Sequence, residues 1–172
     1  MGYDIEFMEK KPGQSWEEAM DAWEARAEGP DVHTRPPNWD LVVTRLRELL
    51  GDISVEENPP EWEIYHSPAK ILVSCISGEW SLSVPYWFEG DAARSVTERI
   101  LAICEIIESA TGLRAHDPQL GEAVLSEEWT TEQAASMFDL VAGALRKRAR
   151  QTRSTSVIAS LFRNRLRGAR RL

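Results

Sequence analysis

The sequence predicts an α+β domain: four or five mainly antiparallel strands form a sheet, three or four helices pack on one face, and a basic C-terminal tail follows. Runs with strand periodicity are spaced for hairpins in the middle of the chain, and amphipathic helical patterns flank them on both sides. The length of 172 residues fits one domain of roughly 100–200 residues. We therefore expect an acidic domain over residues 1–150 and a basic tail over residues 151–172, either amphipathic or disordered.

The first third of the chain predicts one strand and two helices. Large apolar residues alternate with acidic residues over residues 2–8, which is the period of a half-buried strand. Ser15 and Glu18 have the spacing of a capping box, and apolar residues then recur at helical spacing over residues 16–28. A second amphipathic pattern predicts a helix over residues 38–50.

The centre predicts a β meander with strands at residues 62–66 and 71–77. Gly78 and Glu79 resemble a two-residue type II′ loop, which would place Ser77 opposite Trp80. The expected pairs on the core face are then Cys75 with Leu82 and Val73 with Val84. The opposite face is expected to be more polar and partly exposed, because it carries Leu72, Ser74, Ile76, Ser81 and Ser83.

The last third predicts two helices separated by a short strand. Asp91 is placed to cap a helix that ends at Thr111 and Gly112, and its apolar stripe is expected to pack on the core face of the sheet. Residues 113–116 form a short strand that Asp117-Pro118 ends. Thr130, with a glutamine three residues later, can cap the last helix.

Charge is divided sharply along the chain. Residues 1–143 hold 28 acidic and 10 basic residues, whereas residues 144–172 hold 10 basic residues and no acid, which together give the net charge of −8. The body should therefore repel nucleic acid and anionic lipid, and the tail should attract them. The tail is expected to contact anionic lipid, nucleic acid or an acidic protein, or to fold onto the acidic body of its own or another copy. Its candidate binding residues are Arg163, Arg165, Arg167, Arg170 and Arg171.

Two groups of residues in the body are candidates for partner binding. Acidic residues that flank an aromatic can meet a basic partner, or they can be a solvated surface; they are Glu56, Glu57, Glu61 and Glu63 around Trp62. Tyr86, Trp87 and Phe88 follow one another at a strand end, so alternation exposes at least one ring. That ring would serve as a partner platform, unless these aromatics only close the end of the core.

Catalytic chemistry has a single candidate, the pair His116 and Asp117 at a strand end, with Tyr86 as a further group for a small hydrolase or transferase. The alternative is an Asx-Pro turn. No metal-ligand spacing and no phosphate-binding loop occurs, so we expect no metal and no cofactor. Cys75 and Cys104 fall on predicted core faces. The apolar runs are too short to cross a bilayer and the N-terminus lacks a signal sequence, so a cytoplasmic location is expected.

The segments Gly2–Phe7 and Thr111–Gln119 resemble the two ends of a group of small bacterial proteins, most without an assigned function. These open with Tyr-Asp-hydrophobic-x-Phe and close with Thr-Gly-Leu, a strand and Asp-Pro-Gln, and some resemble immunity proteins that neutralise toxins. His116 stands where the group commonly has an aromatic, and the tail lies outside the resemblance. The resemblance brings no catalytic residue.

From charge and resemblance together we expect a non-catalytic cytosolic binding protein, immunity-like or antitoxin-like, whose acidic body docks a basic partner such as a toxin or effector. The alternatives are an adaptor anchored through its basic tail and a small enzyme that uses His116 and Asp117. A homo-oligomer is compatible with each of them.

Overall fold

The computed structural model of the protein describes residues 2–27 and 31–148. Its sheet has seven antiparallel strands in the order β2-β3-β4-β5-β1-β6-β7. Along the chain the elements are β1 (Gly2–Met8), α1 (Trp16–Ala27), α2 (Trp39–Leu50), β2 (Ser54–Asn58), β3 (Glu61–His66), β4 (Ile71–Ile76), β5 (Glu79–Pro85), α3 (Asp91–Thr111), β6 (Arg114–Asp117) and β7 (Glu122–Ala123). A further helix, called here the C-terminal helix, covers residues 131–148.

The α+β class is confirmed, but the sheet has seven strands where the sequence predicted four or five. The two additional strands lie at the edges of the sheet. β2 is exposed at most of its positions, so it has no buried apolar alternation to reveal it, and β7 is only two residues long. The five arginines proposed for the tail, at positions 163, 165, 167, 170 and 171, lie outside the described residues.

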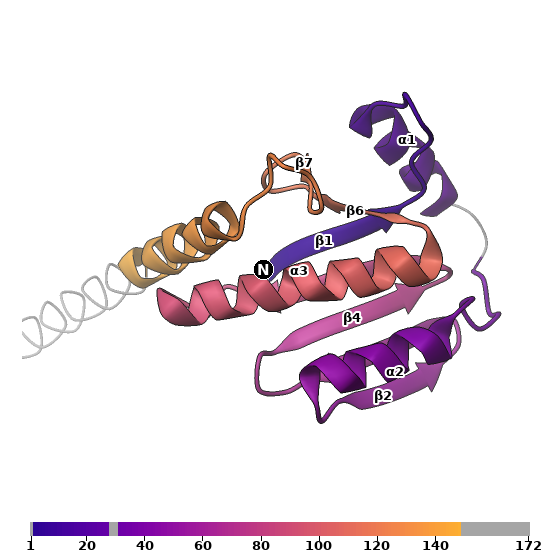
Figure 1. Ribbon diagram of the computed structural model, residues 1–172, viewed down its shortest axis with the longest axis horizontal. Coiled ribbons are helices and arrows are strands. Elements are labelled where there is room, and N and C mark those ends of the chain that lie inside the picture. The colour runs from indigo at the N-terminus through magenta and orange to yellow at the C-terminus, as the bar shows by residue number, and fades with distance from the viewer. Residues whose placement is uncertain (1, 28–30, 149–172) are drawn as a thin grey trace, which may run out of the picture.

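One face of the sheet forms the core. Cross-strand partners Ile5, Leu82, Val73 and Ile64 make a continuous buried row through β1, β5, β4 and β3. α2 and α3 lie side by side across this face (Figure 1), and the apolar residues that the sequence placed on α3 are buried there. Each such side chain contributes about 1.5–3 kcal/mol when it is fully buried. The C-terminal helix packs on the same face, where Phe138 stacks on Tyr3 with ring centroids 5.0 Å apart.

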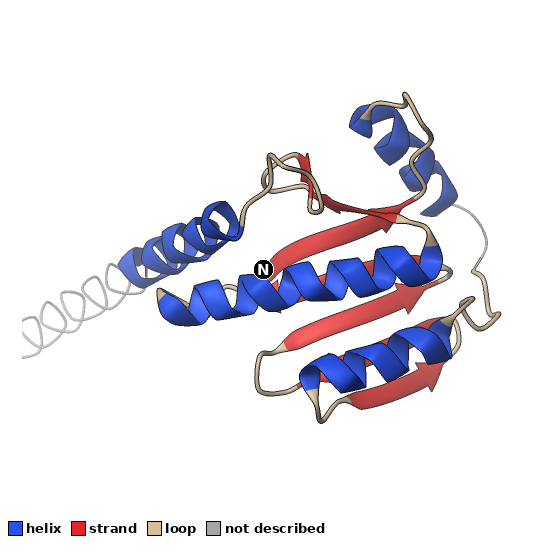
Figure 2. Ribbon diagram, in the orientation of Figure 1, coloured by secondary structure: helices blue, strands red, loops and turns tan. Residues whose placement is uncertain are grey.

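α1 departs from the prediction that all helices pack on one face. Its first residue, Trp16, lies 4.6 Å from the ring of His116, measured between centroids. His116 is paired with Glu6 across β6 and β1, so it faces away from the core row. α1 therefore covers part of the face opposite α2 and α3, and Figure 2 shows it at one end of the sheet, apart from the other helices.

The β4–β5 hairpin differs from its predicted register. Cys75 pairs with Trp80 and Val73 with Leu82, so each partner on β5 is two residues earlier than expected. The loop is Ser77-Gly78, whose φ angles of 51° and 90° are both positive, as in a type I′ turn. A shift of two residues keeps every side chain on its predicted face.

Helix starts were predicted well where a side chain caps them. Ser15 and Glu18 form the reciprocal capping box, with the Glu18 N–H donating to Ser15 Oγ at 3.1 Å and the Ser15 N–H to Glu18 Oε2 at 2.9 Å. Thr130 caps the C-terminal helix in the same way. At α3 the expectation was wrong: Gly90 occupies the cap position without a side-chain bond, and Asp91 is the first helical residue.

Candidate protein-binding face

The face of the sheet opposite α2 and α3 is polar and acidic. Directly paired residues point to the same side, so the register defines rows of side chains that cross the sheet. The central row runs through six strands, and a row lies on either side of it. We call these residues the open face: Glu56, Glu63, Ser74, Ser81, Glu6 and His116 in the central row, with Asn58, Glu61, Ile76 and Glu79 on one side and Ser54, Tyr65, Leu72, Ser83 and Asp4 on the other.

Five carboxylates of the open face make no hydrogen bond or ion pair with any residue that the structure describes; they are Glu6, Glu56, Glu61, Glu63 and Glu79. Glu56 and Glu63 stand directly opposite each other on β2 and β3. Like charges in that position repel and destabilise the strand pair. The sixth carboxylate, Asp4, accepts a hydrogen bond from Ser83 Oγ at 2.6 Å.

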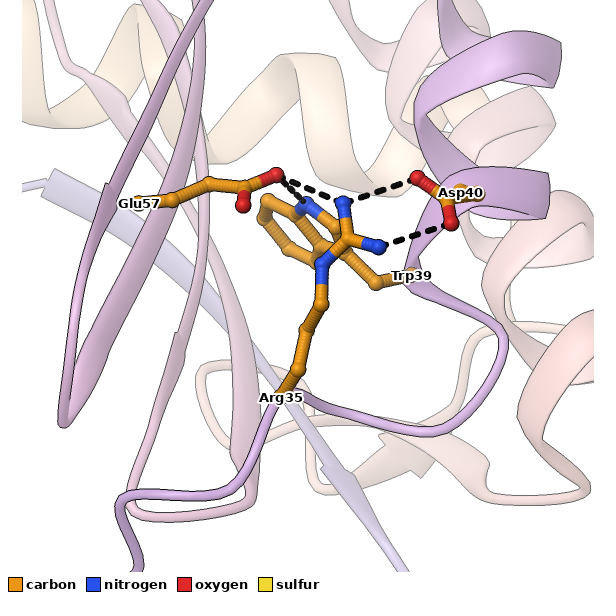
Figure 3. Close-up of polar contacts among 4 residues, drawn as sticks. All are labelled: Arg35, Trp39, Asp40 and Glu57. Carbon is orange, nitrogen blue, oxygen red and sulfur yellow. Dashed lines mark hydrogen bonds and ion pairs between the residues drawn. The ribbon is translucent and has the colours of Figure 1, made fainter.

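Carboxylates on the core side of the same strands are paired. The clearest case is Glu57, which alternates with Glu56 and points toward α2 (Figure 3). Its Oε1 accepts from Arg35 Nη2 at 2.7 Å and from Trp39 Nε1 at 2.9 Å, and Asp40 binds the same guanidinium through both oxygens. The hydrogen bonds from Arg35 and Trp39 lower the pKa of Glu57 below its usual range. Glu57 therefore fastens the edge strand to α2 and is not part of the open face.

Asp117 is also fully paired and fully buried. Its Oδ2 accepts hydrogen bonds from the Tyr3 hydroxyl and from Trp129 Nε1, the latter at 2.8 Å. Its Oδ1 accepts from the backbone N–H groups of Gln119 at 2.9 Å and Leu120 at 3.1 Å. Burial, together with the neighbouring carboxylate, raises the pKa of the Tyr3 phenol. These contacts join β1, β6 and the loop before the C-terminal helix, which is a structural role.

The proposed catalytic pair is not brought together. Adjacent residues of a strand point to opposite faces, and His116 stacks under Trp16 on the open face while Asp117 points into the core. His116 is only 3 % exposed, and burial lowers its pKa. The ring of Tyr86 packs against Tyr3 and Phe138. In the described residues these groups do not form a nucleophile and base within reach of each other.

Partial burial without a partner perturbs two acids of the open face. Burial and then the charges of Asp4, Glu24 and Glu79 raise the pKa of Glu6. Burial likewise raises the pKa of Glu79, and the charge of Arg26 offsets part of that rise. Both shifts have the sign of a carboxylate that has lost water without gaining a donor. A cation placed on this face would reverse that effect.

The aromatic residues singled out in the sequence divide between core and surface. Trp62 is 2 % exposed and Tyr86 is 6 % exposed, so neither offers its ring to a partner, and this part of the prediction is corrected. Trp62 alternates with Glu61 and Glu63 along β3, so its side chain points into the core while theirs point to the open face. Trp87 is 72 % exposed and is the ring that alternation required to be outside. The open face adds Tyr65 and Ile76 as exposed apolar residues.

Sequence reasoning missed Glu6 and Glu79 as members of the acidic face. The signal for Glu6 was present, because its alternation with Ile5 and Phe7 places it on the solvent side of β1. That Glu6 shares a face with Glu79 and Glu63 depends on the strand order β3-β4-β5-β1, which joins segments more than fifty residues apart in sequence. No local pattern carries that information.

The described part of the chain contains no group of three or more His, Cys, Asp and Glu side chains arranged to hold a metal ion. None of its helices combines the length and apolar character that a bilayer span requires. Comparisons of the chain with protein-family models, curated proteins and solved structures found no match.

Proposed function

We propose that this chain is a non-catalytic protein-binding domain whose open face docks a basic surface of a partner protein. The partner class that the resemblance to immunity proteins implies, a basic toxin or effector, fits this proposal. The same proposal holds that the chain is cytosolic and that it binds its partner without a cofactor.

The observation that carries the proposal is the contrast between the two faces of one sheet. On the core side, Glu57 accepts hydrogen bonds from Arg35 and Trp39, and both oxygens of Asp117 accept hydrogen bonds. On the open side, Glu56 and Glu63 repel each other across two strands and have no cation within the described residues. Arg114, which pairs with Met8 at the start of β6, binds Glu108 of α3 at 2.8 Å and not an acid of the open face.

A basic partner would relieve this repulsion. Complementary charge raises the association rate and rejects wrong partners, while apolar contacts supply the central part of a stable interface. The open face offers both kinds of contact, because Tyr65 is 36 % exposed and Ile76 is 44 % exposed among the acids. The serines of the central row keep the surface flat, with Ser74 and Ser81 bonded to each other at 2.8 Å.

The test is affinity capture with the full chain, with E56Q/E63Q, and with E98Q/E105Q as a control that removes the same charge from exposed positions of α3. A partner of the open face is defined as a protein captured by the wild type and the control but not by E56Q/E63Q. It is then purified and its Kd measured by calorimetry at several salt concentrations. We expect E56Q/E63Q to weaken binding about fivefold or more, because each of the two exposed ion pairs with the partner contributes roughly 0.5 kcal/mol. We also expect added salt to weaken binding of the wild-type chain.

Two results would overturn the proposal. The first is that no protein distinguishes E56Q/E63Q from the control. The second is that a captured partner has an acidic surface and binds independently of salt. A full-length chain with the five tail arginines at 163, 165, 167, 170 and 171 changed to glutamine separates the alternative: partners lost only in that variant would assign binding to the tail and not to the open face.

A further inference from the structure

A cavity of about 580 Å³ opens beside the open face, between α1 and the β4–β5 turn. Its size is within the roughly 300–1,000 Å³ of ordinary ligand sites. Two of its residues, Ile76 and Glu79, belong to the open face, so a partner docked there also reaches the cavity. The residues that matter to the argument are Met8, Trp23, Arg26, Asp31, Ile76 and Glu79.

The charged residues that line the cavity are Glu9, Asp31 and Glu79 against Arg26. Arg26 is held by Glu9 at 3.4 Å, and Asp31 accepts a hydrogen bond from Ser77 Oγ at 3.0 Å. Glu79 alone among these acids has no hydrogen bond or ion pair within the described ranges 2–27 and 31–148. The cavity therefore holds an excess of negative charge, and that excess is centred on Glu79.

Two polar atoms of the cavity residues are buried without a partner among the described residues: the acceptor Glu79 Oε1 and the donor Trp23 Nε1. An unpaired buried polar atom costs about 1–3 kcal/mol, so a ligand that pairs with it recovers that cost on binding. Here the two atoms differ in kind, since one needs a donor and the other an acceptor. Both are covered in the unbound chain, so their side chains must turn toward the cavity when a ligand enters.

We propose that this cavity receives an arginine side chain of the docked protein partner, with the guanidinium on the Glu79 carboxylate and a partner main-chain carbonyl on Trp23 Nε1. An arginine peptide supplies both missing groups. A guanidinium also stacks on an indole face and binds a carboxylate through two N–H groups, which an ammonium cannot do. The assignment rests on the proposed function, because the open face determines that the partner is a basic protein.

The probe is the blocked tripeptide acetyl-Gly-Arg-Gly-amide, titrated into the ¹⁵N-labelled full chain. The neutral isostere with citrulline in place of arginine is the matched control ligand. The readout is the indole N–H resonance of Trp23, which W23F identifies among the seven tryptophans. We expect the arginine peptide to shift this resonance saturably, with a Kd on the order of 1 mM, and citrulline to leave it in place.

Two substitutions with opposite effects make the test specific. E79Q should weaken peptide binding about tenfold or more, because the guanidinium then meets a neutral acceptor with a single accepting oxygen. Glu61 lies on the open face but does not line the cavity, so E61Q should leave binding unchanged. R26Q should strengthen binding, because the charge of Arg26 acts on Glu79 and competes with the guanidinium of the peptide. A merely structural role of Glu79 would not produce this reversal.

The inference is overturned if the peptide gives no saturable shift, or if E79Q and E61Q bind it equally. This assay contains no docking partner, so its outcome is independent of the E56Q/E63Q capture. If the peptide does not bind but E56Q/E63Q loses a captured partner, only the cavity assignment is wrong. If the peptide binds but no captured protein distinguishes E56Q/E63Q from the control, the cavity is an arginine site and the open face is not a docking surface.

Discussion

Replacing Asp117 by asparagine tests the role of the buried carboxylate at the junction of β1, β6 and the C-terminal helix. The carboxylate accepts four hydrogen bonds, two on each oxygen. An asparagine can keep its oxygen toward the backbone N–H groups of Gln119 and Leu120. Its NH₂ group then lies where Tyr3 and Trp129 donate, and only the Tyr3 hydroxyl can turn to accept from it.

The magnitude follows from this count of donors. The Trp129 indole N–H is left buried without an acceptor, which costs about 2 kcal/mol. The two backbone bonds change from charged to neutral acceptors and lose about 0.5–1 kcal/mol each. Release of the buried charge offsets part of the loss. We expect D117N to lower the free energy of unfolding by about 3 kcal/mol, or the melting temperature by about 6–12 °C.

The assay is urea unfolding followed by circular dichroism, with linear extrapolation to water. D139N is the matched control, because Asp139 is exposed and accepts a single bond, from Gly90 N–H at 2.8 Å. Its expected cost is under about 1 kcal/mol. Y3F, which removes one donor, should fall between the two. If D117N cost no more than D139N, the carboxylate would not be holding these elements together.

Three further predictions concern the pKa shifts and the backbone. Because the pKa of Glu6 is raised in the folded state, protonated Glu6 stabilises the fold below pH 4.5, the ordinary pKa of a glutamate, and this stabilisation is lost as the pH rises through the folded-state pKa. E6Q should therefore stabilise the protein at pH 7 and much less at pH 4, which melting curves at the two pH values will measure. G78A should lower the free energy of unfolding by about 1 kcal/mol, because Gly78 has a φ of 90° even though the space for a Cβ is open. G143A, within the C-terminal helix, should raise the free energy of unfolding by up to about 1 kcal/mol. Equal effects of the two variants in denaturant titrations would contradict this. Burial raises the pKa of Cys75 to about 12 and that of Cys104 well above its usual range. A thiol reagent at pH 8 should therefore label both cysteines only as fast as the chain unfolds. Rapid labelling of either cysteine in the native chain would contradict their burial.

Local patterns predicted the elements whose signals are local. The alternation around Ile5 located β1, and the capping boxes at Ser15 and Thr130 located the starts of two helices, because each depends on atoms within a few residues. The faces of Val73 and Leu82 were also predicted correctly, although their pairing was displaced. Side-chain alternation is a property of the strand itself, whereas register depends on the turn.

The candidate site was predicted only in part. Glu56, Glu61 and Glu63 were recognised as candidates for a basic partner, and they lie on the open face. Glu57 was grouped with them, but alternation turns it toward Arg35 and Trp39. A run of acids along one strand cannot all face the same side, so the group had to divide.

The sequence by itself determined the α+β class, the acidic body, and the residues that alternate into the core, since these follow from composition and from periods of 2 and 3.6 residues. Tertiary structure alone decided that β1 inserts between β5 and β6, so that Glu6 joins Glu63 and Glu79 on one face. It also decided that α1 borders a cavity on that face. Both depend on contacts between segments far apart in the chain, and only the packing of the whole sheet selects them.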